Sequence, residues 1–177
     1  KIPLSLIVST IKISYNFTGI VYRMWINLYT GNIERSRHML RIGMLTSGGD
    51  CQALNAAMRG VVKGLFSKRD DVEIYGFQDG YKGLIYSNFK MLTSKDFSGI
   101  LTLGGTILGT SRQPFKLMRV PDKDGIDKVE AMKHTYHKLN LDCLVILGGN
   151  GTHKSANMLR EEGLNVVPLP KTIDNDL

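Results

Sequence analysis

Two glycine-rich turns contain the residues best suited to chemistry. The first is Thr46-Ser47-Gly48-Gly49-Asp50, and the second is Gly148-Gly149-Asn150-Gly151-Thr152-His153. Each is predicted to lie between a strand and a helix, where glycines let the backbone approach a ligand and helix N–H groups point toward an anion. A tight turn with Asp50 near a helix start explains the first motif alone equally well. Two such turns together favour phosphate binding, with a hydroxyl supplied by Thr152.

The second turn does not match two familiar phosphate-binding motifs. No Gly-Lys-Ser/Thr follows it, as in a Walker loop, and the Gly-x-Gly-x-x-Gly spacing of a dinucleotide fold is absent.

Two further segments place charged residues beside glycine or proline. Residues 104–112 are too glycine-rich for a helix and end on Arg112, whose guanidinium suits a phosphate. In residues 171–176 two carboxylates flank Asn175, and a lysine stands three positions before Asp174. Taken alone, the first segment is equally a surface loop with a solvated arginine. The second alone is better explained as a solvated acidic loop.

Apolar runs alternate with stretches in which apolar residues recur every three or four positions. The sequence predicts strands at residues 41–46, 72–77, 142–147 and 165–169, and helices at 54–65, 126–139 and 153–162. This alternation predicts an α/β fold, a Rossmann-like parallel sheet of βαβ units with helices on both faces. Ligands bind beyond the carboxyl ends of the strands in such sheets, where both glycine turns are expected.

Composition excludes several classes of protein. The 177 residues suit one domain or slightly more, and 42% hydrophobic with 22% charged residues argues against disorder, collagen and coiled coil. Two cysteines cannot build a disulfide framework, which indicates an intracellular protein. No apolar stretch approaches the ~20 residues that a membrane-spanning helix needs, so no membrane contact is expected.

The net charge of +7 is unevenly distributed. Residues 1–38 hold five Lys/Arg and one acid, a net of +4, whereas residues 39–177 hold eighteen Lys/Arg and fifteen acids, a net of +3. The later part has no basic run and no aromatic stripe on which bases could stack, so no nucleic-acid partner is expected.

Residues 1–38 lack turn signals and sustained periodicity, and they begin with Lys1. We interpret this segment as upstream sequence read in frame, or as a disordered extension. The triplets for Glu34-Arg35-Ser36 can contain a purine-rich AGGAG tract, which is a bacterial ribosome-binding sequence. This tract would lie a few nucleotides before a start codon at Met39. A genuine, variable extension is the alternative, and the encoding DNA would decide between them.

Five segments, in this order, resemble the ATP-dependent 6-phosphofructokinase family over residues 39–177. They are the first glycine turn with Asn55-Ala56-Ala57-Met58-Arg59-Gly60 behind it, residues 79–84, residues 104–112, the second glycine turn, and residues 170–176. The resemblance implies transfer of the γ-phosphoryl group of ATP to the 1-hydroxyl of fructose 6-phosphate in glycolysis. Residues 39–177 would then be the incomplete nucleotide-binding portion of a two-domain, cytoplasmic, homo-oligomeric enzyme (a dimer or tetramer). This portion is expected to be inactive alone.

The resemblance also implies roles for single residues. The ATP-binding residues would be Gly48, Tyr81, Arg112, Gln113, Gly149, Asn150, Gly151 and Thr152. The sugar phosphate would meet Thr172, Ile173 and Asp174, and Asp174 would take the proton of the attacking hydroxyl. Mg²⁺ would lie near Asn150 and Asp176. Many relatives carry Asp at the position of Asn150, and the amide here brings no charge to a metal.

Gly151 and Lys171 bear on the choice of phosphoryl donor. Pyrophosphate-dependent relatives tend to carry Asp at the first position and often carry Lys at the second. Gly151 leaves room for the α-phosphate of ATP, so ATP is the predicted donor. The alternatives are a pyrophosphate-dependent phosphofructokinase, an NAD-kinase or lipid-kinase type enzyme that shares the second turn, and a non-catalytic truncated nucleotide-binding product.

Overall fold

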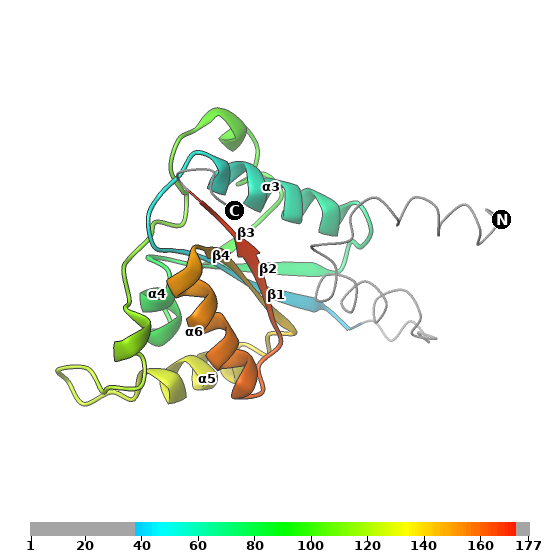
Figure 1. Cartoon of the computed structure of the whole chain (residues 1–177). Helices are drawn as coiled ribbons and strands as arrows, with labels where there is room; N and C mark the ends of the chain where they lie inside the picture. The colour runs from blue at the N-terminus through cyan, green and yellow to red at the C-terminus, as the bar shows by residue number, and fades with distance from the viewer. Residues whose placement is uncertain (1–37, 173–177) are drawn as a thin grey trace, which may run out of the picture. The chain divides into compact units, whose positions relative to one another are not determined.

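The structure of the chain is a computed structural model that describes residues 38–172 (Figure 1). Of the predicted upstream segment only His38 falls within the described residues, so the interpretation of residues 1–38 is not tested here. The elements in chain order are β1 (Leu40–Ser47), α3 (Ala53–Phe66), β2 (Val72–Phe77), α4 (Tyr81–Ile85), β3 (Phe89–Leu92), η1 (Ile100–Thr102), η2 (Phe115–Leu117), α5 (Lys128–Lys138), β4 (Cys143–Gly148), α6 (Asn150–Glu161) and β5 (Val166–Pro170).

The five strands form one sheet in the order β3-β2-β1-β4-β5. Strand β1 pairs in parallel with both β2 and β4, β4 pairs in parallel with β5, and only β3 runs antiparallel, at the edge beside β2. The chain builds the sheet outward from β1 in one direction and then from β4 in the other. The carboxyl ends of β1 and β4 are therefore the switch point at which such folds place their ligands.

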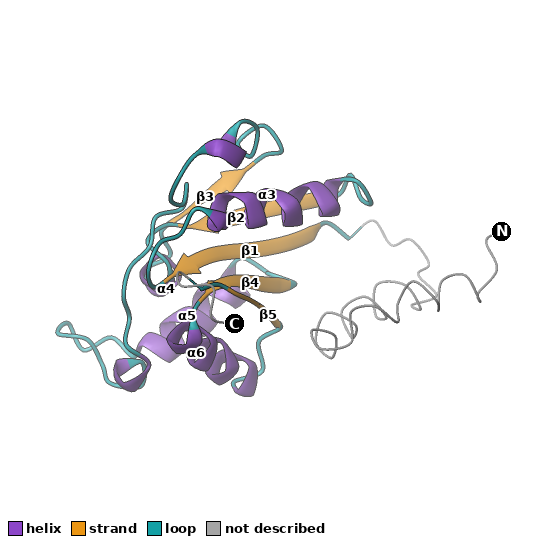
Figure 2. Cartoon of the chain, turned by 45° about the horizontal axis from the view of Figure 1, so that its top comes forward, coloured by secondary structure: helices purple, strands orange, loops and turns teal. Residues whose placement is uncertain are grey.

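Helices cover both faces of the sheet (Figure 2). Helix α3 lies on one face, and α5 and α6 lie on the other. Leu54, Met58 and Val62 recur every four residues and are the apolar residues that α3 buries. Every residue of β4 is buried, as expected of a central strand with helices on both sides.

The predicted α/β fold is confirmed, with two differences in detail. Strand β3 was not predicted, and it makes the sheet mixed, because Ser87 takes a left-handed φ of 55° and the chain turns back along β2. Helix α4 has five residues, too few for a periodic apolar pattern. The four predicted strands and three predicted helices are present, each within one residue of its predicted bounds except the starts of α5 and α6, which differ by two and three residues.

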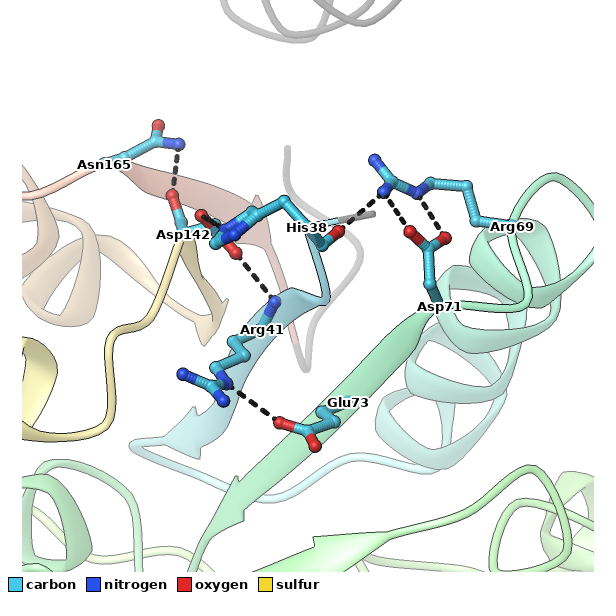
Figure 3. Close-up of polar contacts among 7 residues, drawn as sticks. All are labelled: His38, Arg41, Arg69, Asp71, Glu73, Asp142 and Asn165. Atoms are coloured by element: carbon cyan, nitrogen blue, oxygen red, sulfur yellow. Dashed lines mark hydrogen bonds and ion pairs between the residues drawn. The ribbon is translucent and has the colours of Figure 1, made fainter. Parts of the chain in front are cut away.

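A group of charged side chains ties the strands together at their amino ends, opposite the glycine turns (Figure 3). Asp142, which precedes β4, accepts hydrogen bonds from the Arg41 N–H at 2.8 Å and pairs with the His38 ring at 3.1 Å. Arg41 pairs with Glu73 at 3.0 Å, which joins β1 to β2. These partners all lie next to strand ends, so they support the sheet and are remote from the glycine turns.

Candidate phosphate-binding site

The two glycine turns leave the sheet side by side. Ser47 at the end of β1 pairs in register with Gly148 at the end of β4. Gly48 has a φ of 88°, which favours glycine, and a Cβ placed there would lie 3.5 Å from the Thr152 hydroxyl oxygen. That hydroxyl donates to the Ser47 carbonyl at 3.3 Å. The prediction that both turns lie at the carboxyl ends of strands is confirmed, and they contact each other.

The second turn leads directly into α6. Gly149 immediately precedes the helix, Asn150 is its first residue, and the His153 N–H donates back to the Gly149 carbonyl at 3.0 Å. The N–H groups of the first turn have no partners within the helix, and the helix dipole adds partial positive charge there. Asn150 and Gly151 are exposed while Thr152 is buried. This end of α6 can therefore present backbone N–H groups to a phosphate.

Gly148 and Gly151 lack side chains for different reasons. A Cβ at Gly148 would lie 2.6 Å from the Thr152 side chain, so the close packing of the turn requires glycine there. A Cβ at Gly151 would meet nothing within 4 Å, and its φ lies outside the left-handed region. The fold itself does not require glycine at residue 151.

The loop that ends on Arg112 is bound to the first turn and to the helix behind it. The Thr110 hydroxyl donates to the Gly48 carbonyl at 2.7 Å, and the Thr46 hydroxyl donates to the Gly109 carbonyl at 2.8 Å. Asn55 on α3 donates to the Leu103 carbonyl at 3.1 Å and accepts from the Ile107 N–H at 2.9 Å. The predicted arginine loop and the first glycine turn are thus one connected structure.

Arg112 and Gln113 stand at the end of this loop. Arg112 is exposed and Gln113 is half-buried, and across residues 38–172 the Arg112 guanidinium makes no ion pair. An exposed guanidinium without an ion pair can bind an incoming phosphate without first breaking a salt bridge.

Tyr81 reaches the second turn from inside the fold. Its hydroxyl donates to the Thr152 carbonyl at 2.8 Å, and its side chain is 0% exposed. Burial raises the pKa of Tyr81 above its ordinary value. The resemblance places this residue near the nucleotide; in the structure the buried side chain contacts the backbone of the second turn through its hydroxyl.

Lys171 joins the end of β5 to both turns. Its backbone N–H donates to the Gly148 carbonyl at 3.0 Å, and its ammonium donates to the Gly49 carbonyl. Thr172 follows at a half-buried position. Ile173, Asp174 and Asp176 lie outside the described residues, so the structure brings the acidic segment to the second turn only as far as Thr172.

Residues 38–172 contain no group of three or more His, Cys, Asp or Glu able to hold a metal ion. Asn150, exposed at the second turn, offers a neutral amide oxygen, which is a weaker ligand for a divalent cation than a carboxylate. No helix in the described part of the chain is long and apolar enough to cross a membrane.

The polar residues that fasten the arginine loop lie in segments that the sequence singles out, but their role in holding this loop was not predicted. Thr46 is 0% and Asn55 is 1% exposed. Asn55 has a recognisable signal, because it is a polar residue on the apolar face of α3, between Leu54 and Met58. Thr110 and Ser111 have none, since their partners are distant in sequence.

Comparison with known proteins agrees with this geometry. Residues 41–177 match the family model described as Phosphofructokinase, which spans all four segments of the site. The chain belongs to the phosphofructokinase family. The predicted resemblance is confirmed at the level of the family.

Two relatives of this phosphofructokinase-family chain carry the same name. It is 58% identical over 142 residues to the "ATP-dependent 6-phosphofructokinase" of Spirochaeta thermophila, a match that covers 76% of this chain and 37% of that protein. It is 51% identical over 138 residues to the protein of the same name from Propionibacterium freudenreichii, covering 78% of this chain and 36% of that protein. The chain spans less than two fifths of the length of these two relatives.

Solved phosphofructokinases share the fold. The Pichia pastoris enzyme in the T-state matches with a TM-score of 0.66 and 30% identity, covering 78% of this chain and 16% of that one. A pyrophosphate-dependent phosphofructokinase from Nitrosospira multiformis matches with the same TM-score of 0.66 at 16% identity, covering 79% and 35%. The second likeness establishes the fold alone.

Proposed function

We propose that the protein containing this chain transfers the γ-phosphoryl group of ATP to the 1-hydroxyl of fructose 6-phosphate. The observation that carries the proposal is the pairing of Ser47 with Gly148, which puts two phosphate-suited turns side by side in a chain of this family. The 58% identity to a relative named ATP-dependent 6-phosphofructokinase supports the choice of reaction.

The donor phosphates would lie across the two turns. Backbone N–H groups at the start of α6 and the exposed Arg112 guanidinium would both supply positive potential to these phosphates. Such groups lower the barrier when they meet the charge that builds up on the transferring phosphoryl oxygens. Gly48, Gln113 and the run from Gly149 to Thr152 complete the proposed donor site, while Tyr81 holds the Thr152 carbonyl.

The acceptor sugar would meet Thr172, Ile173 and Asp174. The hydrogen bond from the Lys171 N–H to the Gly148 carbonyl supports this placement, because it starts the segment next to the second turn. Asp174 would accept the proton of the 1-hydroxyl as that oxygen attacks phosphorus, a role in which a positioned carboxylate typically contributes about 10²–10⁴-fold.

Asn150 and Asp176 are the residues that would help to hold a magnesium ion when the donor is bound. The ion supplies charge neutralisation for the phosphoryl oxygens. Asn150 can offer only a neutral oxygen, so its contribution would be to orient the donor or a metal-bound water.

ATP is the proposed donor rather than pyrophosphate. The open space around Gly151 supports this, because nothing in the fold accounts for the missing side chain and a longer donor would use the room. Lys171, which pyrophosphate enzymes often share, has its ammonium on the Gly49 carbonyl and is thus engaged within the protein. We further propose a cytoplasmic homo-oligomer; sedimentation of the complete gene product would test its oligomeric state.

The experiment that tests the proposal follows transfer of labelled γ-phosphate from ATP to fructose 6-phosphate by the complete gene product. We expect labelled fructose 1,6-bisphosphate, and we expect Asp174→Asn to lower kcat about 10²–10⁴-fold with the dissociation constant for ATP nearly unchanged. Near-normal turnover by the variant overturns the role of Asp174. ATP binding without any transfer by the unmodified protein would favour a non-catalytic product instead.

A further inference from the structure

The Thr110 hydroxyl makes one of the hydrogen bonds that join the arginine loop, residues 104–112, to the first glycine turn. Thr110 lies two residues before Arg112, and its hydroxyl donates to the Gly48 carbonyl at 2.7 Å. In return the Gly48 N–H donates to the Ser111 carbonyl at 3.4 Å. Both polar backbone groups of Gly48 are therefore held by the two residues that immediately precede Arg112.

The rest of the loop is fixed independently of this contact. Its earlier part is anchored by the Thr46 hydroxyl on the Gly109 carbonyl, at 2.8 Å, and by the amide of Asn55. The Ser111 hydroxyl donates to the Asp79 carbonyl at 2.5 Å. Loss of the Thr110 hydroxyl would leave these anchors in place, so its effect should be confined to the stretch between Gly109 and Arg112.

We propose that Thr110 is a positioning residue for phosphoryl transfer, whose hydroxyl fixes the spacing between Gly48 and Arg112. The inference rests on the proposed function, in which both of those residues contact the donor. Arg112 is exposed and has no ion pair within the described residues, so its location depends on the backbone that carries it. Small displacements of groups aimed at a transition state cost rate even when no contact is lost.

The test compares Thr110→Val, which keeps the shape and removes the hydroxyl, with Thr110→Ser, which keeps the hydroxyl. In the complete gene product we expect Thr110→Val to lower kcat/KM for ATP about three- to tenfold, the usual range for one hydrogen bond. Thr110→Ser should restore it to within twofold of wild type. Should Thr110→Val fail to fold, Thr110→Ala makes the same comparison.

The matched control is Thr135→Val on α5. Thr135 is 1% exposed, and its hydroxyl pairs with the Ser87 hydroxyl at 2.7 Å, away from both turns. This variant also loses one hydrogen-bonded hydroxyl, at a position more buried than the half-buried Thr110, yet it should keep kcat/KM for ATP. An equal loss in both variants would mean that Thr110 acts only through general stability, which overturns the inference.

A double-mutant comparison with Arg112→Ala separates positioning from an independent role. If Thr110 acts through Arg112, Thr110→Val should cause no further loss in the Arg112→Ala background. Full additivity of the two losses overturns the inference and leaves the proposed function intact. Unchanged kcat/KM in Arg112→Ala alone overturns the role given to Arg112 in the proposed function, and this inference with it.

Discussion

Gly151 is the residue whose surroundings bear most directly on the donor. It lies in the first turn of α6, it is exposed, its φ is not left-handed, and a Cβ there would meet nothing within 4 Å. Glycine in the middle of a helix is roughly 0.5–1 kcal/mol less favourable than alanine, and this penalty is smaller in the first turn. The fold therefore gains no stability from glycine at this position. A phosphate, in contrast, can approach the backbone more closely when residue 151 has no side chain.

We predict that Gly151→Asp lowers kcat/KM for ATP by at least about tenfold, because like charges brought together cost several kcal/mol. The free energy of unfolding should stay unchanged or rise, since a carboxylate in the first turn of a helix is favourable. Steady-state kinetics and urea unfolding would measure the two effects. Gly151→Ala is the control, as it adds a methyl group without charge; retained ATP use in Gly151→Asp would contradict the donor-space explanation.

At this scale the sequence predicts which residue types carry chemistry but not what holds them. Glycine-rich spacing and the family resemblance point to Gly48, Arg112 and Thr152. The partner of Thr110 lies 62 positions away, and that of Tyr81 lies 71 away. Such contacts depend on strand order, which no local pattern specifies.

Two glycines in helices should respond in opposite directions to the same substitution. A Cβ at Gly83 in α4 would lie 2.7 Å from the Gln78 backbone nitrogen and 2.8 Å from the Asn88 carbonyl oxygen, and backbone atoms cannot move aside as side chains do. We predict that Gly83→Ala lowers the free energy of unfolding by about 3 kcal/mol or more. Gly60 in α3 has nothing within 4 Å, so Gly60→Ala should raise it by about 0.4–1 kcal/mol. If urea unfolding gives the same change in free energy for Gly83→Ala and Gly60→Ala, the close packing around α4 is contradicted.

A buried thiol in β4 should make the free energy of unfolding fall at alkaline pH. Burial, and then the nearby Asp142 charge, raises the pKa of the Cys143 thiol from 9.0 to about 12. The folded protein therefore holds this proton more tightly, and the stabilisation is complete below pH 9 and is lost as pH rises toward 12. We predict that wild type loses stability faster than Cys143→Ala over that range, by up to about 1.4 kcal/mol per pH unit. If urea unfolding shows the same pH dependence of the free energy of unfolding for both proteins, the raised pKa of this thiol is contradicted.

The elements that the sequence predicts correctly are those with a strong apolar signal. Strand β4 is fully buried and α3 has a regular apolar face, so both stand out as patterns. Strand β3 has four residues, of which two are exposed, and its signal is correspondingly weak. Its antiparallel direction depends on the tertiary pairing with β2 and could not be derived from local sequence.

For the whole molecule, we predict that a chain starting at Met39 keeps the fold. Such a chain loses the contact of the His38 ring with Asp142 and the hydrogen bond from Arg69 to the His38 carbonyl. The His38 side chain is 63% exposed, and exposed pairs contribute about 0–1 kcal/mol. The thermal midpoint should fall by no more than about 4 °C. Loss of the cooperative transition would show that residues 1–38 belong to the folded protein.

For the molecule as a whole, the sequence predicts the fold class but not the order of the strands. Alternating strands and helices imply an α/β sheet, but the order β3-β2-β1-β4-β5, which makes β1 and β4 neighbours, comes from the structure. That order brings Ser47 and Gly148 together and so turns two separate motifs into one site. The acidic segment after Thr172 lies outside the described residues, and its role remains a prediction.

The most direct measurement is the rate at which the complete gene product converts fructose 6-phosphate to fructose 1,6-bisphosphate, with ATP and with pyrophosphate as donors on one preparation. The site described here, with open space at Gly151 and the Lys171 ammonium engaged by Gly49, predicts turnover with a higher kcat/KM for ATP. A higher kcat/KM for pyrophosphate, or no transfer to the sugar from either donor, would contradict it.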